Sequence, residues 1–197
     1  MSVYRRPPVT GATVFFTVTL ARRGGDLLVR EVELLREAVR VTKAERPFGI
    51  EAWVVLPDHL HAVWRMPPAD RAYGVRWGAI KARFTMAVRE KYEGAGCRVG
   101  FHPTDDTSDE PGMVGWNPTL RSASKVRKGD AGLWQRRFWE HHIRDEADYW
   151  AHLRYCWMNP VKHGFVARPE DWPWSSVHRD ARYVPGMGLG LESLGRA

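Results

Sequence analysis

The chain has 197 residues, of which 44% are hydrophobic and 27% are charged, a composition that excludes intrinsic disorder as its overall class. Two cysteines are too few for a disulfide-stapled scaffold, and no apolar stretch approaches the roughly 18 residues that a membrane span needs. The net charge of +7 favours an anionic partner such as nucleic acid, and we expect a cytoplasmic protein without membrane contact.

The first half of the chain alternates between strand-like and helix-like patterns. β-Branched and aromatic residues indicate strands, and apolar residues that recur every three or four positions indicate helices. The expected elements are strands over 12–20, 49–56 and 59–65, and helices over about 29–45 and 75–92. Because only the turn at Pro57-Asp58 separates the second and third strands, we expect them to pair as an antiparallel hairpin.

The second half begins with a segment in which apolar residues show neither helical nor strand periodicity. Residues 93–132 are rich in Gly, Pro, Ser, Asp and Thr, which predicts a flexible insertion. A fourth strand is expected over 133–143 and a third helix over 146–158, with Asp145 as its N-cap and its end at Asn159, before a proline. We expect one domain over 1–180 and a loose, Gly-rich tail over 181–197.

Without the insertion, the first six elements follow the order β-α-β-β-α-β. This order matches a ferredoxin-like fold of the α+β class, in which an antiparallel sheet carries its helices on one face. The helix over 146–158 is additional to that plan.

Two histidines stand out on the third expected strand. Side chains alternate along a strand, so His59 and His61 share one face and can bind one metal ion together. The alternative is a pair of surface histidines on a polar, solvent-accessible sheet face. Asp58 is expected to be a turn residue rather than a ligand.

The helix around Tyr155 carries a second group of candidates. His152, Tyr155 and Asn159 are spaced so that they share one helical face. A phenol becomes a useful nucleophile when a cation lies close by and a metal polarises its target. The alternative is a buried aromatic stripe, because other aromatic residues neighbour Tyr155 on the same helix.

A basic stretch over 121–144 is the third candidate feature. It holds seven Lys or Arg residues against two acids, and Trp134, Phe138 and Trp139 are interleaved with them. Basic side chains bind phosphates and aromatic rings stack on bases, so the stretch indicates a nucleic-acid interface. An ordinary solvated face is the alternative.

These motifs together resemble a known family, the REP-associated tyrosine transposases of the HUH endonuclease superfamily. The matching segments are YRR at 4–6, FFTV at 15–18, AWVVLPDHLHAVW at 52–64, WQRRFWEHHIRD at 134–145, YCWMNPVKHG at 155–164 and DWPWSSVHRD at 171–180. The insertion over 93–132 is longer than the family usually carries there.

The resemblance implies a chemistry for these residues. It makes Tyr155 the nucleophile, His59 and His61 the paired-histidine motif, and Asn159 the residue that completes a site for Mg²⁺ or Mn²⁺. The implied reaction cleaves single-stranded DNA, leaves a 5′-phosphotyrosine link and a free 3′-OH, and is reversed by a second 3′-OH to transfer the strand.

The implied substrates are short palindromes that fold as hairpins, and the implied setting is the nucleoid. From their charge and position, we expect the following residues to contact DNA: Arg5, Arg6, Trp134, Arg136, Arg137, Arg144 and Lys162. The protein is expected to act as a monomer or a homodimer. Two alternative functions stay open: a non-catalytic protein that binds DNA or RNA hairpins, and a structural zinc protein that uses His59 and His61.

Overall fold

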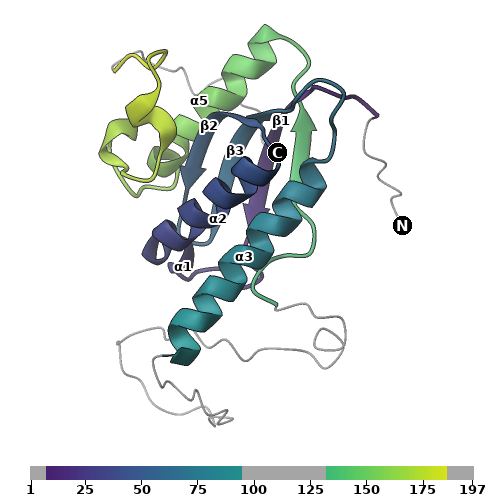
Figure 1. The fold of residues 1–197 in the computed structure, drawn as a ribbon. Coiled ribbons are helices and arrows are strands. Elements are labelled where there is room, and N and C mark those ends of the chain that lie inside the picture. Colours follow the sequence, from purple (N-terminus) through teal and green to yellow (C-terminus); the bar gives the residue numbers. More distant parts are fainter. Residues whose placement is uncertain (1–7, 95–131, 186–197) are drawn as a thin grey trace, which may run out of the picture.

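The computed structural model describes residues 8–94 and 132–185, and a four-stranded antiparallel sheet forms its centre (Figure 1). Its strands are β1 (Thr13–Thr19), β2 (Gly49–Val55), β3 (His59–Arg65) and β4 (Trp139–His142). The strand order is β2-β3-β1-β4, so β1 and β3 are central. β2 and β3 pair antiparallel, which confirms the predicted hairpin.

Helices cover both faces of this sheet. The helices are α1 (Leu27–Arg30), α2 (Val32–Glu45), α3 (Tyr73–Gly94) and α5 (Glu146–Lys162), followed by the short 3-10 turns η1 (Pro169–Asp171) and η2 (Ser176–Arg179). Figure 1 shows α2 and α3 side by side on one face and α5 on the other. The predicted α+β, ferredoxin-like fold with an additional C-terminal helix is confirmed.

The face under α2 and α3 holds the larger core. Alternate residues of the two central strands point into it, as the period of two predicts: Val14, Phe16, Val18, Leu60, Ala62 and Trp64. The Trp64 ring stacks on Trp77 of α3 with centroids 4.2 Å apart. This packing fixes which residues of β1 and β3 face the opposite side.

The opposite face packs against α5. Phe15 of β1 and Val63 of β3 contribute to a second core, together with three α5 residues: Leu153, Cys156 and Trp157. His59 and His61 lie on this covered face and are only 7% and 3% exposed. The expectation of a solvent-accessible histidine face is therefore wrong, because the C-terminal helix covers the side that the ferredoxin-like plan leaves open.

Helix α5 runs further than predicted. It continues through Pro160 to Lys162, although proline disfavours helical geometry in the residue before it. Pro160 cannot donate to the Cys156 carbonyl, but its ring holds φ near the helical value. It is also buried, and a backbone bond beyond it, from His163 N to the Asn159 carbonyl (3.0 Å), continues the helical pattern. Packing thus outweighs the local preference.

Two other boundaries differ from the predictions. The strand expected over 133–143 is regular only in β4, while Trp134 makes an isolated bridge to Leu20. The helix expected over 29–45 begins earlier and is divided into α1 and α2 at Glu31, whose buried carboxylate accepts hydrogen bonds from Lys91 and Tyr92 of α3. A buried carboxylate must be hydrogen-bonded, and the helix is divided at the residue where these bonds form.

Several expectations fall on residues outside the described ranges: Arg5, Arg6, nearly all of the insertion over 93–132, and the tail after residue 185. The part of the tail that is described makes defined contacts. Arg182 bonds to Asp180 and Glu51, and the Tyr183 ring packs edge-on against Trp157. Within 8–94 and 132–185, no helix is long and apolar enough to cross a membrane.

Candidate active site

The two histidines of β3 lie edge to face, with ring centroids 5.1 Å apart. Each ring is held at Nδ1 by a polar partner: His59 by Asp58 Oδ1 at 2.7 Å and His61 by Thr17 Oγ1 at 2.9 Å. When Nδ1 is held in this way, Nε2 is left to act as the metal ligand. His61 Nε2 is buried and has no hydrogen-bond partner among the described residues.

Burial also sets the protonation of these rings. Desolvation, followed by the neighbouring His59, lowers the pKa of His61 to about 3. Burial likewise lowers the pKa of His59, although the Asp58 carboxylate opposes the shift. Both imidazoles are therefore neutral near pH 7, which is the form that ligates a cation.

Tyr155 on α5 faces this histidine pair. Its ring centroid lies 5.0 Å from that of His61 and 5.6 Å from that of Phe15, which itself stacks on His61. The Nζ atom of Lys162 lies 5.1 Å from the centre of the Tyr155 ring. A phenol, two neutral imidazoles and a cation therefore gather where α5 crosses β3.

Asn159 lies one helical turn beyond Tyr155 and is 1% exposed. Neither atom of its side-chain amide finds a hydrogen-bond partner within the described chain. A buried, unpaired amide costs free energy unless a ligand satisfies it. Together with His61 Nε2, these unpartnered atoms fit a divalent cation bound by two imidazoles and an amide oxygen.

A cavity of about 740 Å³ opens next to the histidine pair. Arg23, His59, His163 and Phe165 are among its lining residues. Arg23 donates to Asp58 Oδ2 (2.7 Å), and the His163 ring lies 5.3 Å from that of His59. The cavity therefore brings Arg23 and His163 to the border of the histidine pair.

Sequence reasoning missed four supporting residues: Asp58, Thr17, Arg23 and His163. The signal for Asp58 was its position beside the first histidine, yet it was interpreted only as a turn residue. Its carboxylate joins three groups, because it accepts from Arg23, from the Gly24 backbone N–H and from His59. Thr17 becomes a candidate only when the β1–β3 register places it opposite His61.

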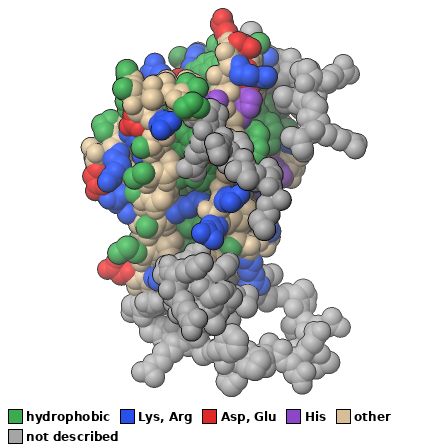
Figure 2. All heavy atoms as spheres, turned by 90° about the vertical axis from the view of Figure 1, so that its right-hand side faces the viewer, with side chains coloured by type: hydrophobic (Ala, Val, Ile, Leu, Met, Phe, Trp, Pro, Cys, Tyr) green, Lys and Arg blue, Asp and Glu red, His purple; other side chains and the backbone are tan. Residues whose placement is uncertain are grey.

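Most of the basic residues that we expect to contact DNA are exposed to solvent. Arg136, Arg137, Arg144 and Lys162 are exposed, and Arg144 also pairs with Asp148. Figure 2 shows Lys and Arg side chains, with histidines nearby, on the side of the molecule that carries α3 and β4. These positions suit contact with a phosphate backbone.

Trp134 does not suit that role. It is 7% exposed and packs in the core against Phe84, so neither face of its ring is free to stack on a base. The burial of Trp134 therefore argues against a contact of its ring with DNA. Trp139 of β4 is 54% exposed instead, and its ring meets Phe15 edge-on with centroids 5.7 Å apart.

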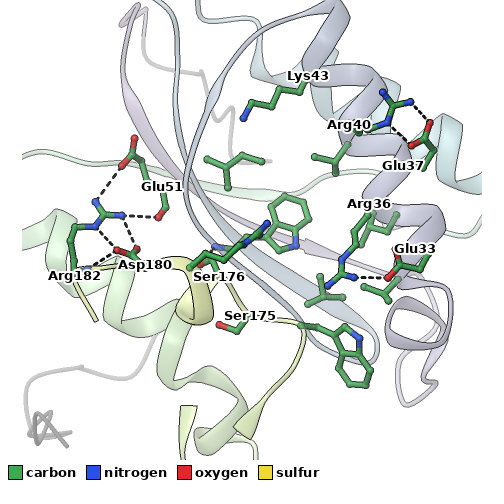
Figure 3. Close-up of a pocket in the computed structure, with 18 residues that line it drawn as sticks. Glu33, Arg36, Glu37, Arg40, Lys43, Glu51, Ser175, Ser176, Asp180 and Arg182 are labelled. Atoms are coloured by element: carbon green, nitrogen blue, oxygen red, sulfur yellow. Dashed lines mark hydrogen bonds and ion pairs between the residues drawn. The ribbon is translucent and has the colours of Figure 1, made fainter. Parts of the chain in front are cut away.

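A second hollow of about 690 Å³ lies between α2, β2 and η2 (Figure 3). It contains neither the paired histidines nor Tyr155. Most of its arginines are neutralised by neighbouring acids, as in the pairs Arg36–Glu33 and Arg40–Glu37. The chemistry therefore concentrates at the histidine pair on the other face of the sheet.

Comparison with known proteins points to one family, although no family model matches the chain. A REP-associated tyrosine transposase of Escherichia coli is 38% identical over 180 residues, which are 91% of this chain and 85% of the relative. A Haemophilus influenzae relative of the same description is 36% identical over 182 residues, 92% of this chain and 89% of its own.

A solved structure supports the same relationship. It is that of a REP-associated tyrosine transposase bound to a REP hairpin, and it matches with a TM-score of 0.68 and 38% identity. The match covers 91% of this chain and 85% of that one.

Proposed function

Because the chain belongs to the family of REP-associated tyrosine transposases, we propose that it cleaves and rejoins single-stranded DNA beside a hairpin, with Tyr155 as nucleophile and with a divalent cation. The family implies a DNA-cleaving enzyme. The mechanism and the metal dependence are our proposal for this chain.

One observation carries the proposal. The Tyr155 ring lies 5.0 Å from that of His61, whose buried Nε2 has no partner within the described chain. Such an arrangement is costly for a protein that only binds nucleic acid, since an unpaired buried polar atom destabilises the fold. It is useful to an enzyme that brings a phosphate, a cation and a phenol together.

His59, His61 and Asn159 are the residues that would hold the cation, with Mg²⁺ or Mn²⁺ as the candidates. When bound, the cation would polarise a non-bridging oxygen of the scissile phosphate and so favour attack at phosphorus. The contacts of Asp58 with His59 Nδ1 and of Thr17 with His61 Nδ1 orient the two imidazoles for this purpose.

The chain's own residues then carry out the transfer. Tyr155 Oη loses its proton and forms a bond to phosphorus, while the bond from phosphorus to the 3′ oxygen breaks and that oxygen takes up a proton. The products are a 5′-phosphotyrosine and a free 3′-OH, and attack by another 3′-OH reverses the step. Lys162, which lies over the Tyr155 ring, attracts the phosphate to the nucleophile.

We assign hairpin binding to the exposed Lys and Arg residues near β4 and at the end of α5. The solved relative is bound to a REP hairpin, which supports a hairpin as the substrate class here. Arg136, Arg137, Arg144 and Lys162 are our phosphate-contacting candidates in the described chain, and Arg5 and Arg6 extend the set. We propose a soluble protein that works in the cytoplasm on nucleoid DNA, as a monomer or a homodimer.

The test uses a labelled hairpin oligonucleotide with a single-stranded flank, incubated with the full chain and Mn²⁺. We expect a shortened strand and a covalent protein–DNA product on a denaturing gel, and neither when a chelator is added. His61→Ala should lose both products and keep hairpin binding. Binding without any cleavage in the unaltered protein would contradict the proposal and favour the non-catalytic hairpin-binding protein.

A further inference from the structure

A second group of metal-ligating side chains lies outside the proposed active site. His141 of β4 and Asp148 and His152 of α5 each offer one ligand atom, and these atoms all lie within 4.8 Å of one another. We propose that these three residues bind a transition-metal ion such as Zn²⁺, which ties β4 to the first turns of α5.

The donor geometry is already close to that of a metal site. His141 Nε2 lies 2.8 Å from Asp148 Oδ2, and His152 Nδ1 lies 3.1 Å from Asp148 Oδ1. His152 Nδ1 also donates to the Asp148 backbone carbonyl at 2.8 Å, a bond that an ion would replace. The two imidazole rings stack with centroids 4.6 Å apart, so both lie beside the same carboxylate. The residues come from a strand and a helix, and the ion would therefore link two elements.

Arg144 competes for the same carboxylate but leaves room for an ion. Its backbone N–H and its Nε both donate to Asp148 Oδ2, at 3.0 and 3.2 Å. Its side chain is 75% exposed and can turn to solvent, and Asp148 Oδ1 does not bond to it in the structure. The ion would replace the contact of the carboxylate with this exposed guanidinium.

The donor set indicates the class of metal. Two imidazoles and one carboxylate favour Zn²⁺ and similar divalent transition ions, whereas Mg²⁺ prefers oxygen ligands. His141 and His152 are partly exposed, so water can reach a fourth position. The site shares no ligand with the histidine pair of β3, and the Phe15 ring contacts both His152 and His61.

The test measures metal binding by the whole chain after it has been stripped with a chelator. The probe is Co²⁺, whose visible absorption reports tetrahedral coordination. It is titrated into the His59→Ala/His61→Ala double variant, which lacks the ligands of the proposed active site. We expect one equivalent of Co²⁺ with intense visible bands, displaced by Zn²⁺ and retained in excess Mg²⁺.

Adding His141→Ala to that double variant should abolish the bands and the bound equivalent. His142→Ala is the matched control and should leave both unchanged, because this neighbouring side chain faces Tyr73 on the other side of the sheet. Far-ultraviolet circular dichroism checks that each variant folds. His141→Gln, which keeps a polar side chain of similar size, should also lose the ion.

Two results would overturn the inference: no Co²⁺ bound by the double variant, or binding that His141→Ala leaves intact. Should the double variant fail to fold, the same comparison is made in the unaltered chain, where His141→Ala must remove one equivalent of Co²⁺. Neither result bears on DNA cleavage, so this site and the proposed function fail independently.

Discussion

Each proposed ligand histidine is oriented by one neighbour. Asp58 Oδ1 holds His59 at 2.7 Å, and Thr17 Oγ1 holds His61 at 2.9 Å. Asp58 also accepts from Arg23, which lines the cavity beside the pair. The carboxylate thereby connects the His59 ring to Arg23. If His59 binds a metal ion as proposed, loss of this partner should weaken metal binding without removing a ligand.

Asp58→Ala tests this arrangement. We expect the Mn²⁺ concentration for half-maximal hairpin cleavage to rise about 10–100-fold, since outer-shell partners contribute that much to metal affinity. Saturating Mn²⁺ should restore much of the rate. Asp26→Ala is the control: Asp26 lines the same cavity, but its exposed carboxylate pairs only with Arg30 in the structure. An unchanged Mn²⁺ requirement in Asp58→Ala would remove Asp58 from the site.

Helix α5 is the element that assembles the site. Its N-terminus is capped by Asp145, whose side chain accepts a hydrogen bond from Asp148 N at 2.8 Å. Beyond the cap, one face of the helix packs in the core, and the Tyr155 ring lies against that of His61. The position of the nucleophile therefore depends on how firmly this helix is anchored.

Asp145→Ala should lower the free energy of unfolding by about 1 kcal/mol, the typical cost of losing an N-cap. Asp145→Asn should cost much less, because asparagine caps about as well as aspartate. Urea unfolding of the two variants gives the comparison. Equal losses in both would show that the charge of Asp145, rather than its cap, stabilises the helix.

Patterns along the sequence predicted the elements because these depend on local spacing, whereas the chemistry proposed for the site came from the family resemblance. Alternation along β3 separated Leu60, Ala62 and Trp64, which enter the core, from His59 and His61 on the other face. Helical spacing placed Tyr155 and Asn159 together. These are properties of a few consecutive turns or strand positions, which a single sequence displays directly.

Long-range packing could not be predicted in the same way. No local pattern shows that α5 covers the histidine face, that Trp134 enters the core against Phe84, or that Pro160 continues a helix. Each of these outcomes depends on contacts between segments far apart in the chain. The partners of the histidines were missed for the same reason, since Thr17 meets His61 only through strand pairing.

Over the whole molecule, the net charge of +7 is distributed unevenly. On α2, arginines pair with acids three positions away, as Arg36 does with Glu33. Arg136 and Arg137, just before β4, are exposed and make no ion pair within the described chain. A phosphate backbone should therefore bind to the β4 side rather than to α2, because the positive charge before β4 is not neutralised by neighbouring acids.

Salt dependence of hairpin binding tests this distribution. Arg136→Ala/Arg137→Ala should reduce the slope of log affinity against log salt by about 1–2, since each lost phosphate contact contributes about 0.7–0.9. Arg36→Ala/Arg40→Ala on α2 removes the same charge and should leave the slope nearly unchanged. A larger effect of the α2 variant would move the DNA interface to that face.

The most direct measurement asks whether the Tyr155 hydroxyl becomes covalently joined to DNA. Tyr155→Phe removes one oxygen and should bind the hairpin with nearly unchanged affinity, because affinity comes from phosphate and base contacts. Tyr149→Phe is the matched control, since that phenol donates to Glu51 of β2. On a denaturing gel with Mn²⁺, we predict that the protein–DNA adduct and the cleaved strand disappear in Tyr155→Phe and persist in Tyr149→Phe. An adduct formed by the Tyr155→Phe protein would contradict the assignment of the nucleophile and with it the proposed reaction.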